Sequence, residues 1–312
     1  MAIKKKTFSA ADRAAYIESK KDEVKGLLDT LTANVKALSS SDDWKKYLKF
    51  QTFFRRYSFN NVLLISIQCP NATAVAGYRT WQKAGRQVKK GAKSIKILAP
   101  IVRKFNVKAE NDQGQMEETE KKSLYFRAVP VFDVSQTEGE PLPTAQRCTL
   151  LSGNEAEAAE AFDTLLSFAS DLGYKVEDEK LAEGLNGYVD FSAAKRIVLR
   201  AGNPKLQKAK TLAHEIAHVL LHSTPEARKD INHDSSDYRE VEAESVAFCV
   251  MNAFGLDSGS YSFGYVATWS GGDAKKIQQS ASRIQKAVCQ ILDAVLPESM
   301  GESDEEGAAE AA

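Results

Sequence analysis

The sequence TLAHEIAHVLLH, residues 211–222, constrains the fold most, because it places three histidines and a glutamate within an apolar run. In a helix, His214 and His218 lie one turn apart on the same face, so both imidazoles can reach one metal ion. Glu215 is rotated by about 100° and flanks the open coordination position, where it can accept a proton from a metal-activated water. The apolar neighbours indicate a buried helix, whose polar side chains need partners. The motif therefore predicts a metal site rather than two histidines that only pack in a core.

A third ligand has to come from another part of the chain. His222 continues the spacing of four, but it lies ~12 Å along a straight helix from His214, so it is expected to be a histidine at the helix end. The next helix carries Glu240 and Glu244 within an apolar arc, where carboxylates are costly unless they bind a metal or hold a ligand. Glu242 falls on the polar side of the same helical wheel and is expected to be solvated.

The net charge is zero, with 42 basic and 42 acidic residues, but the two signs are unevenly distributed. Residues 1–110 hold 23 Lys and Arg against 8 Asp and Glu, and residues 44–109 hold 15 basic residues and no acidic one. A solvated surface normally mixes both signs, because like charges repel. The basic run therefore predicts a polyanionic partner, and the opposite bias of the remaining chain indicates two domains with different roles.

Residues 44–81 interleave nine aromatic side chains with basic ones. Aromatic rings can stack on unpaired bases while Lys and Arg neutralise phosphates, a combination suited to single-stranded nucleic acid. Several of these aromatics recur at helical spacing, so most of them are expected to build a core instead. The residues predicted to contact DNA are Arg55, Arg56, Arg79, Trp81, Lys83, Arg86, Lys89, Lys90, Lys93 and Lys96.

Apolar periodicity and turn residues predict an α+β protein with two domains. The helical pattern covers residues 9–39, 41–57, 60–67, 155–172, 204–222, 237–254 and 273–296. Short β-like runs cover residues 73–78, 94–99, 101–107, 124–134, 187–191 and 196–199, with Pro100 ending one of them and a polar hairpin-like loop at 110–121.

Composition sets the expected domain boundaries. Residues 1–137 form the basic domain, residues 138–150 a linker, residues 151–296 the domain with the histidine motif, and residues 297–312 a disordered acidic tail. No stretch of about 18 apolar residues is present, and no apolar segment follows the first lysines, so we expect a cytoplasmic protein with no membrane segment. The four cysteines lie far apart and predict neither a disulfide framework nor a thiolate metal site.

The motif TLAHEIAHVLLH followed by REVEAESVAFCV resembles the zinc metallopeptidase domain of the ImmA/IrrE kind, which is similar to thermolysin-type gluzincins. The resemblance implies Zn²⁺ as the cofactor, held by His214, His218 and Glu240, with Glu215 as the catalytic base. Glu244 would orient a ligand histidine, although the roles of the two glutamates could be exchanged. It also implies that the strand at 196–199 is the edge strand on which an extended peptide substrate lies.

The segments YSFNNVLLISIQCPNATAVAGYRTW and KAGRQVKKGAKSIKILAP resemble the N-terminal single-strand-binding domain of ArdC-type antirestriction proteins, over residues 41–134. In that family the domain coats single-stranded DNA that arrives by conjugation. The resemblance therefore implies a mobile-element protein whose N-terminal domain has single-stranded DNA as its partner.

Together these features predict a single-stranded-DNA-binding protein of a plasmid, phage or integrated element, with a zinc-dependent endopeptidase domain and a role in protecting incoming DNA from restriction. One alternative is a non-enzymatic DNA-protecting protein whose metal only stabilises the second domain. Another is a regulatory peptidase that cleaves a repressor or another DNA-bound protein. An open coordination position beside a cleft would favour a peptidase.

Overall fold

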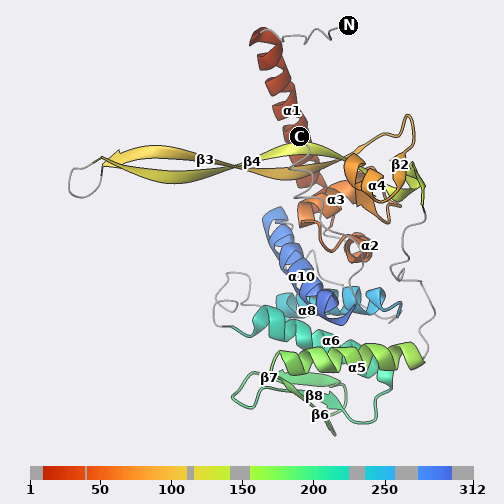
Figure 1. The fold of residues 1–312 in the computed structure, drawn as a ribbon. Coiled ribbons are helices and arrows are strands. Elements are labelled where there is room, and N and C mark those ends of the chain that lie inside the picture. Colours follow the sequence, from red (N-terminus) through yellow and green to blue (C-terminus); the bar gives the residue numbers. More distant parts are fainter. Residues whose placement is uncertain are drawn as a thin grey trace. The chain divides into compact units, whose positions relative to one another are not determined.

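The computed structural model describes residues 10–38, 41–110, 116–140, 155–224, 236–256 and 273–296 (Figure 1). The chain divides into two compact units. Unit 1 comprises Met1–Leu31, Leu64–Glu140 and Ser303–Ala312, and unit 2 comprises Thr32–Leu63 and Pro141–Glu302. Each unit contains both helices and strands, which confirms the predicted α+β class. No helix among the described residues is long and apolar enough to cross a bilayer.

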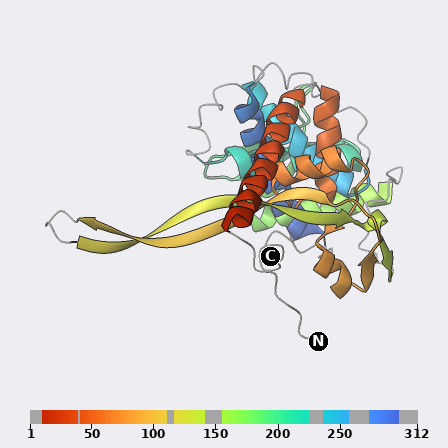
Figure 2. The same ribbon diagram turned by 90° about the horizontal axis from the view of Figure 1, so that it is seen from above.

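Unit 1 is built around an antiparallel sheet in the order β1-β4-β3, formed by Val75–Ala76, Met116–Asp133 and Ile95–Glu110 respectively. The long strands β3 and β4 pair from Ile95↔Val131 to Glu110↔Met116. Side chains near the start of β3 are buried, whereas Val102 and Leu124 farther along are 59% and 57% exposed. We call residues 100–110 and 116–126 the ribbon, because they continue as a two-stranded arm beyond the core of this unit (Figures 1 and 2).

The continuity of β3 corrects two sequence expectations. Pro100 was expected to end a strand, but it lies within β3, opposite Phe126 of β4. Among the described strands, β3 pairs only with β4, and a proline is tolerated in such an edge strand because its missing N–H can face away from the partner. The expected loop at 110–121 is also shorter than predicted, since pairing continues to Met116 and only residues 111–115 lie outside the described residues.

Unit 1 also contains helical elements. The 28-residue helix α1, Ala10–Ala37, confirms the first predicted helix; it begins in unit 1 and its last residues belong to unit 2. The short helix α4, Tyr78–Lys83, was not predicted; it is fixed by Trp81, whose Nε1 donates to the carbonyl of Phe132 at 2.9 Å.

Two short strands, β2 (Arg86–Val88) and β5 (Thr137–Gly139), form a separate antiparallel pair. Gly139 has φ 131°, and a Cβ atom there would lie 2.4 Å from the carbonyl oxygen of Gly85, so only glycine fits this strand end. The predicted linker therefore begins as a strand, and its residues 141–150 lie outside the described residues.

Unit 2 combines a three-stranded sheet with packed helices. Its predicted helices are confirmed as α5 (Glu155–Asp171), α6 (Lys205–His222), α8 (Ser236–Ala253) and α10 (Ala274–Val295). The predicted hairpin is confirmed as β7 (Gly187–Asp190) and β8 (Arg196–Arg200). Strand β6 (Lys175–Glu179) was not predicted, because its sequence KVEDE is mostly charged.

The strand order β6-β8-β7 overturns the expectation that the strand at 196–199 is an edge strand. Strand β8 is central, since it pairs in parallel with β6 and antiparallel with β7. The edge of this sheet next to α6 is β7. Gly187 starts β7, and a Cβ atom there would lie 2.6 Å from Cγ2 of Thr211 and 2.8 Å from the carbonyl oxygen of Val198, so glycine allows the strand to approach the helix closely.

Two helices from the N-terminal part of the chain also pack in unit 2. Helix α2, Ser41–Phe53, contacts α8, and its fully buried Trp44 donates from Nε1 to Oγ of Ser245 at 3.0 Å. Helix α3, Phe59–Gln68, begins in unit 2 and ends in unit 1. The compact units thus divide the chain differently from the expected boundary at residue 137, because α2 packs against α8. The predicted acidic tail lies outside the described residues.

Candidate metal centre and DNA-contact surface

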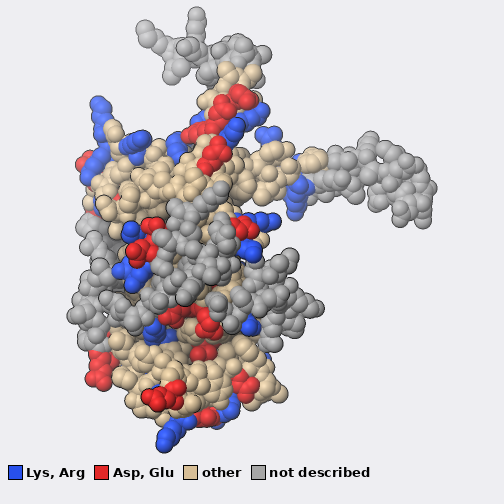
Figure 3. Space-filling view, turned by 180° about the vertical axis from the view of Figure 1, so that it is seen from behind, with Lys and Arg blue, Asp and Glu red and all other residues tan. Residues whose placement is uncertain are grey.

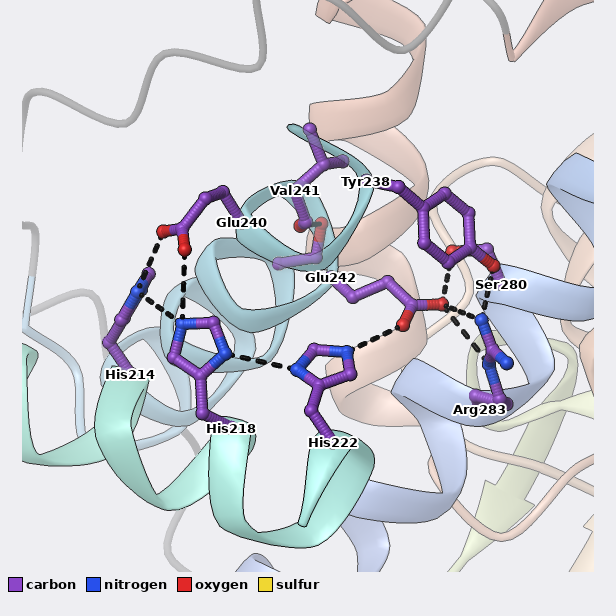
Figure 4. A network of polar contacts seen from close by, with 10 residues as sticks. His214, His218, His222, Tyr238, Glu240, Val241, Glu242, Ser280 and Arg283 are labelled. Atoms are coloured by element: carbon purple, nitrogen blue, oxygen red, sulfur yellow. Dashed lines mark hydrogen bonds and ion pairs between the residues drawn. The ribbon is translucent and has the colours of Figure 1, made fainter. Parts of the chain in front are cut away.

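Helices α6 and α8 bring together the histidine motif and the glutamates of the following helix (Figure 4). His214 Nε2 lies 3.0 Å from His218 Nε2 and 3.2 Å from Glu240 Oε2, and His218 Nε2 lies 3.4 Å from Glu240 Oε1. Ligand atoms bound tetrahedrally at ~2.0–2.1 Å are about 3.3 Å from one another. The three donor atoms therefore have the chemistry and the spacing that a zinc-sized cation requires.

The two glutamates on either side of Glu242 face different nitrogens of the motif. Glu240 faces the Nε2 atoms, whereas Glu244 Oε2 lies 3.2 Å from Nδ1 of His214, and its Oε1 lies 3.3 Å from Nζ of Lys210. The expectation that both carboxylates are buried in an apolar arc is wrong for Glu240, whose side chain is 61% exposed. Helix α8 is buried on several sides, so its apolar residues do not define a single inward face.

The charges of the cluster favour a bound cation. Burial alone lowers the pKa of His214, but hydrogen bonds to Glu240 and Glu244 outweigh it and raise that pKa to about 9. Hydrogen bonds from His214 and His218 hold the pKa of Glu240 far below its usual range. The glutamates therefore stabilise positive charge at this position. A proton on a histidine can supply that charge, and a bound metal cation can supply it instead.

Glu215 lies on α6 and is only 6% exposed. Burial raises its pKa, while the charges of His214 and His218 and a backbone hydrogen bond with Val189 of β7 oppose the rise. A carboxylate with a raised pKa is suited to accept a proton and return it. The sequence predicted that this side chain lies beside the metal position. In the structure it lies on the side of α6 that faces the edge strand β7, next to His214 and His218.

A cleft of about 730 Å³ opens in unit 2 beside these groups. Its wall on the sheet side comes from the segment that contains β7, including Tyr188, Val189 and Phe191. Its opposite wall comes from α6 and α8, including His218 and Glu240. An extended chain lying against β7 would therefore pass directly beside the three converging donors.

A buried polar network that no sequence expectation included lies behind His218 (Figure 4). His222 is 3% exposed and joins His218 to Glu242, whose side chain is fully buried and also contacts Ser280 and Arg283 of α10. The expectation that Glu242 is solvated is therefore wrong, because α10 packs against that side of α8. The one sequence signal for the network was the continued four-residue spacing to His222.

The residues predicted to contact DNA fall into several environments. Trp81 is only 4% exposed and hydrogen-bonded to the backbone, so it is a core residue and cannot stack on a base. Arg55 is also buried and pairs with Asp293 of α10 at 3.2 Å in unit 2, which corrects its assignment as a DNA contact. Arg56 in the same unit is exposed, 3.9 Å from Asp293.

The other predicted DNA contacts belong to unit 1. Arg86 donates from Nε to Oγ1 of Thr137 at 2.8 Å and thereby joins β2 to β5, and Lys96 pairs with Glu23 of α1 at 3.4 Å. The structure leaves the remaining basic side chains exposed: Arg79, Lys83, Lys89, Lys90 and Lys93.

Two known families match separate parts of the chain. The family described as the N-terminal domain of the anti-restriction factor ArdC matches residues 21–132, and the IrrE N-terminal-like domain family matches residues 169–252. The chain joins an ArdC-type domain to an IrrE-like domain. The IrrE-like domain is metallopeptidase-like, and it contains the three converging donors and Glu215 but ends before α10.

An uncharacterized protein of Bacillus anthracis is 27% identical over 314 residues, which cover 89% of this chain and 52% of that protein. The chain thus spans about half the length of this curated relative. Two crystal structures of the antirestriction protein ArdC from the R388 plasmid, metal-free and Mn(II)-bound, are 21% and 20% identical. Each match covers 76% of this chain and 84% of the other, with a TM-score of 0.43.

The ArdC-type domain also carries exposed aromatic residues on the ribbon that the sequence analysis did not single out. Phe105, Tyr125 and Phe126 are 46%, 53% and 45% exposed, and the guanidinium of Arg103 lies 5.8 Å from the ring centre of Tyr125. Figure 3 shows basic side chains on the described part of this ribbon. The sequence indicated only short β-like runs here, and the continuation of β3 and β4 beyond the core leaves these rings exposed.

Proposed function

We propose that the IrrE-like domain is a zinc-dependent endopeptidase. The observation that carries this proposal is the convergence of His214, His218 and Glu240 beside a cleft whose opposite wall is an edge strand. His214, His218 and Glu240 would hold the ion. When bound, zinc would supply Lewis acidity and lower the pKa of a water in the cleft.

Glu215 then has the role of general base in this proposal. Its carboxylate lies beside both histidines and accepts a backbone hydrogen bond from Val189, which fixes it between the metal position and β7. From there it can take a proton from the attacking water and deliver it to the leaving amine. Glu244 holds His214 from the side opposite to Glu240 and thereby orients its ring.

The substrate is an extended peptide that adds to β7 on the side away from β8, where none of the described strands pairs with it. Strand β7, rather than β8, is the strand with which the substrate would pair, because β8 already pairs with β6 and β7 on its two sides. Backbone pairing of this kind binds peptides with little dependence on their sequence, and pockets for alternate side chains supply the selectivity.

The test is the variant Glu215→Gln in the full chain. It is expected to retain zinc at the wild-type stoichiometry and to lose cleavage of an unfolded protein such as casein. The exposed Glu183→Gln, a matched change that leaves the motif intact, is the control. A fully active Glu215→Gln protein would exclude the base role. If the wild-type protein binds zinc but cleaves no substrate, the alternative in which the metal only stabilises the fold is favoured.

We also propose that the ArdC-type domain binds single-stranded DNA and that the whole protein protects incoming DNA of a mobile element from restriction. The 15 basic residues without an acidic one in residues 44–109, and the exposed cations among them in unit 1, support this proposal. The ribbon extends the candidate surface, since residues 100–105 and 122–126 hold three basic residues, no acidic one, and exposed aromatic rings.

A further inference from the structure

The two ring nitrogens of His218 face different surroundings. Its Nε2 atom faces His214 and Glu240, where the proposed metal binds, and its Nδ1 atom lies 3.0 Å from Nδ1 of His222. A hydrogen bond between two imidazole nitrogens requires one to carry the proton and the other to offer its lone pair. The direction of this single bond therefore decides whether Nε2 of His218 is available to a metal.

The other nitrogen of His222 is fixed by a buried carboxylate. His222 Nε2 lies 3.1 Å from Oε2 of Glu242, whose side chain has no exposed surface. The second oxygen, Oε1, accepts from Oγ of Ser280 at 2.8 Å and from Nη2 and Nε of Arg283 at 2.8 and 3.2 Å. Arg283 also donates to the hydroxyl of Tyr238, so the guanidinium is held on two sides (Figure 4).

With both imidazoles neutral, as a metal-ligating histidine pair requires, these contacts allow one order of donors and acceptors. Glu242 as a carboxylate can only accept, so the neutral His222 donates from Nε2 and keeps a lone pair on Nδ1. His218 then donates from Nδ1 and keeps its own lone pair on Nε2, which is the form that a metal ligand needs.

We propose that His222 and Glu242 are positioning residues that set the tautomer and ring orientation of His218, with Ser280 and Arg283 of α10 fixing the carboxylate. The inference rests on the proposed zinc site. It assigns different supports to the two ligand histidines: Glu244 contacts His214 directly, whereas His218 reaches its carboxylate through a second imidazole. It also makes α10, which lies outside the matched IrrE-like domain, part of the metal site.

The wild-type protein gives the first test. The chain has only four histidines, so selective ¹⁵N labelling of histidine and two-bond ¹⁵N–¹H correlation can report the tautomer of each ring in the zinc-loaded full chain. We expect His222 to carry its proton on Nε2 and His218 on Nδ1. We call the hydrogen-bond chain from Glu242 through His222 to His218 the relay. A His222 ring protonated on Nδ1 would overturn the relay, regardless of the results obtained with variants.

The second test is zinc affinity measured by competition with a chelating dye. In Glu242→Gln, Arg283 and Ser280 hold the amide oxygen, so the amide N–H₂ group faces His222 and reverses its tautomer. His222→Phe removes the acceptor but fills the space. Both variants are expected to bind zinc about 10–100-fold more weakly than wild type, the usual effect of losing a group that orders a ligand.

Two further variants separate the relay from a packing effect. His222→Asn places an amide oxygen near the position of Nδ1, so it should recover part of the affinity that His222→Phe loses. Glu160→Gln on the exposed surface of α5 makes the same chemical change as Glu242→Gln away from the site and should bind as wild type does. An asparagine variant as weak as the phenylalanine variant would overturn the role of the acceptor.

The outcomes also distinguish this inference from the function on which it rests. A wild-type protein that does not retain zinc would remove the proposed peptidase site. A wild-type protein that binds zinc, with Glu242→Gln and His222→Phe within twofold of it, would overturn the relay alone. Circular dichroism of each metal-free variant shows whether the fold is kept, and the measurement of tautomers in the wild type decides the matter if a variant does not fold.

Discussion

Gly187 and Thr211 are packed so closely that a Cβ atom on Gly187 would lie 2.6 Å from Cγ2 of Thr211. This contact sets the distance between β7 and α6, and therefore the width of the cleft beside the histidine motif. The same Cβ atom would lie 2.8 Å from the carbonyl oxygen of Val198, which belongs to the central strand β8. A side chain at residue 187 would thus push the edge strand away from both of its neighbours.

Gly187→Ala is expected to lower the free energy of unfolding by about 1–3 kcal/mol, the usual cost of inserting a methyl group into a packed region. Thr211→Ser in the same background should restore only part of this loss, because the clash with Val198 stays. Gly26→Ala in α1 is the control, since nothing lies within 4 Å of its Cβ position. Urea unfolding followed by circular dichroism measures all three, and a Gly187→Ala protein as stable as wild type would contradict the contact.

Metal retention should be most sensitive to the residues that supply the converging donor atoms, and less sensitive to the residue that only orients one of them. His218→Ala is expected to abolish stoichiometric zinc after gel filtration, and Glu240→Gln to weaken binding strongly, because each removes a donor atom from the cluster. Glu244→Gln should have a smaller effect, since Glu244 contacts Nδ1 of His214 and Lys210 rather than the Nε2 atoms that converge with Glu240. Elemental analysis of the purified variants checks the order. A Glu244→Gln protein that loses more zinc than Glu240→Gln would exchange the two roles.

Charge reversal on the exposed lysines of unit 1 should reduce the salt dependence of DNA binding. In the full chain, Lys89, Lys90 and Lys93 changed to Glu are expected to weaken single-stranded DNA binding. They should also flatten the slope of log K against log salt by roughly 0.7 for each lost phosphate contact. Fluorescence anisotropy with a labelled oligonucleotide measures the slope.

The matched control for this experiment reverses three exposed lysines of unit 2, namely Lys180, Lys275 and Lys286. Both triple variants have the same net charge, so a general electrostatic effect would change them equally. Equal slopes in the two variants would contradict the assignment of the DNA surface to unit 1.

Two aromatic substitutions should separate a core residue from a base-contacting one. Trp81→Ala is expected to destabilise the protein by about 3–5 kcal/mol, because its ring is buried and its N–H is bonded to Phe132. Tyr125→Ala on the ribbon should leave the melting temperature unchanged and weaken single-stranded DNA binding by about 1–3 kcal/mol if the ring stacks on a base. Thermal melts and anisotropy on both variants check this, and unchanged DNA binding by a folded Tyr125→Ala protein would remove the ribbon from the surface.

The thiols of the buried Cys249 and the half-buried Cys289 should resist alkylation in the folded protein. Burial raises the pKa of Cys249 to about 12 and that of Cys289 to about 11, so at pH 8 almost no reactive thiolate is present. Reactivity should increase as the pH approaches these values. Iodoacetamide labelling followed by peptide mass spectrometry measures the rates, with the protein in urea as the fully reactive control. Labelling of Cys249 in the folded chain at the rate seen in urea would contradict its burial.

Most elements of unit 2 could be predicted closely because they have a clear local signal. The apolar period of 3.6 residues indicated α5, α6 and α10, and two short β-like runs separated by a turn indicated the hairpin of β7 and β8. Helix α8 was predicted as a helix as well, although its apolar residues do not define a single face. Strand β6 is mostly charged, with the sequence KVEDE, and is held by its parallel pairing with β8, a contact distant in sequence that no local pattern reports.

In unit 1 the sequence patterns were less informative. The turn propensity of Pro100 indicated two short strands, but a long continuous pairing with β4 outweighs the preference of one residue. Likewise, helical periodicity could show that α2 has an apolar face. It could not show that this face packs with α8 in unit 2 rather than within the basic half of the chain.

The sequence by itself determined the chemistry of the metal site, because two histidines four residues apart on a helix must share one face and Glu215 must lie beside them. It also determined the charge of the N-terminal half. Only the tertiary structure decided which carboxylate faces which nitrogen, since Glu240, Glu242 and Glu244 alternate around α8 and their partners come from α6 and α10. A helical wheel places side chains around one axis, whereas burial depends on the helices that pack around that axis, and here α10 buries the side of α8 that the wheel assigned to solvent.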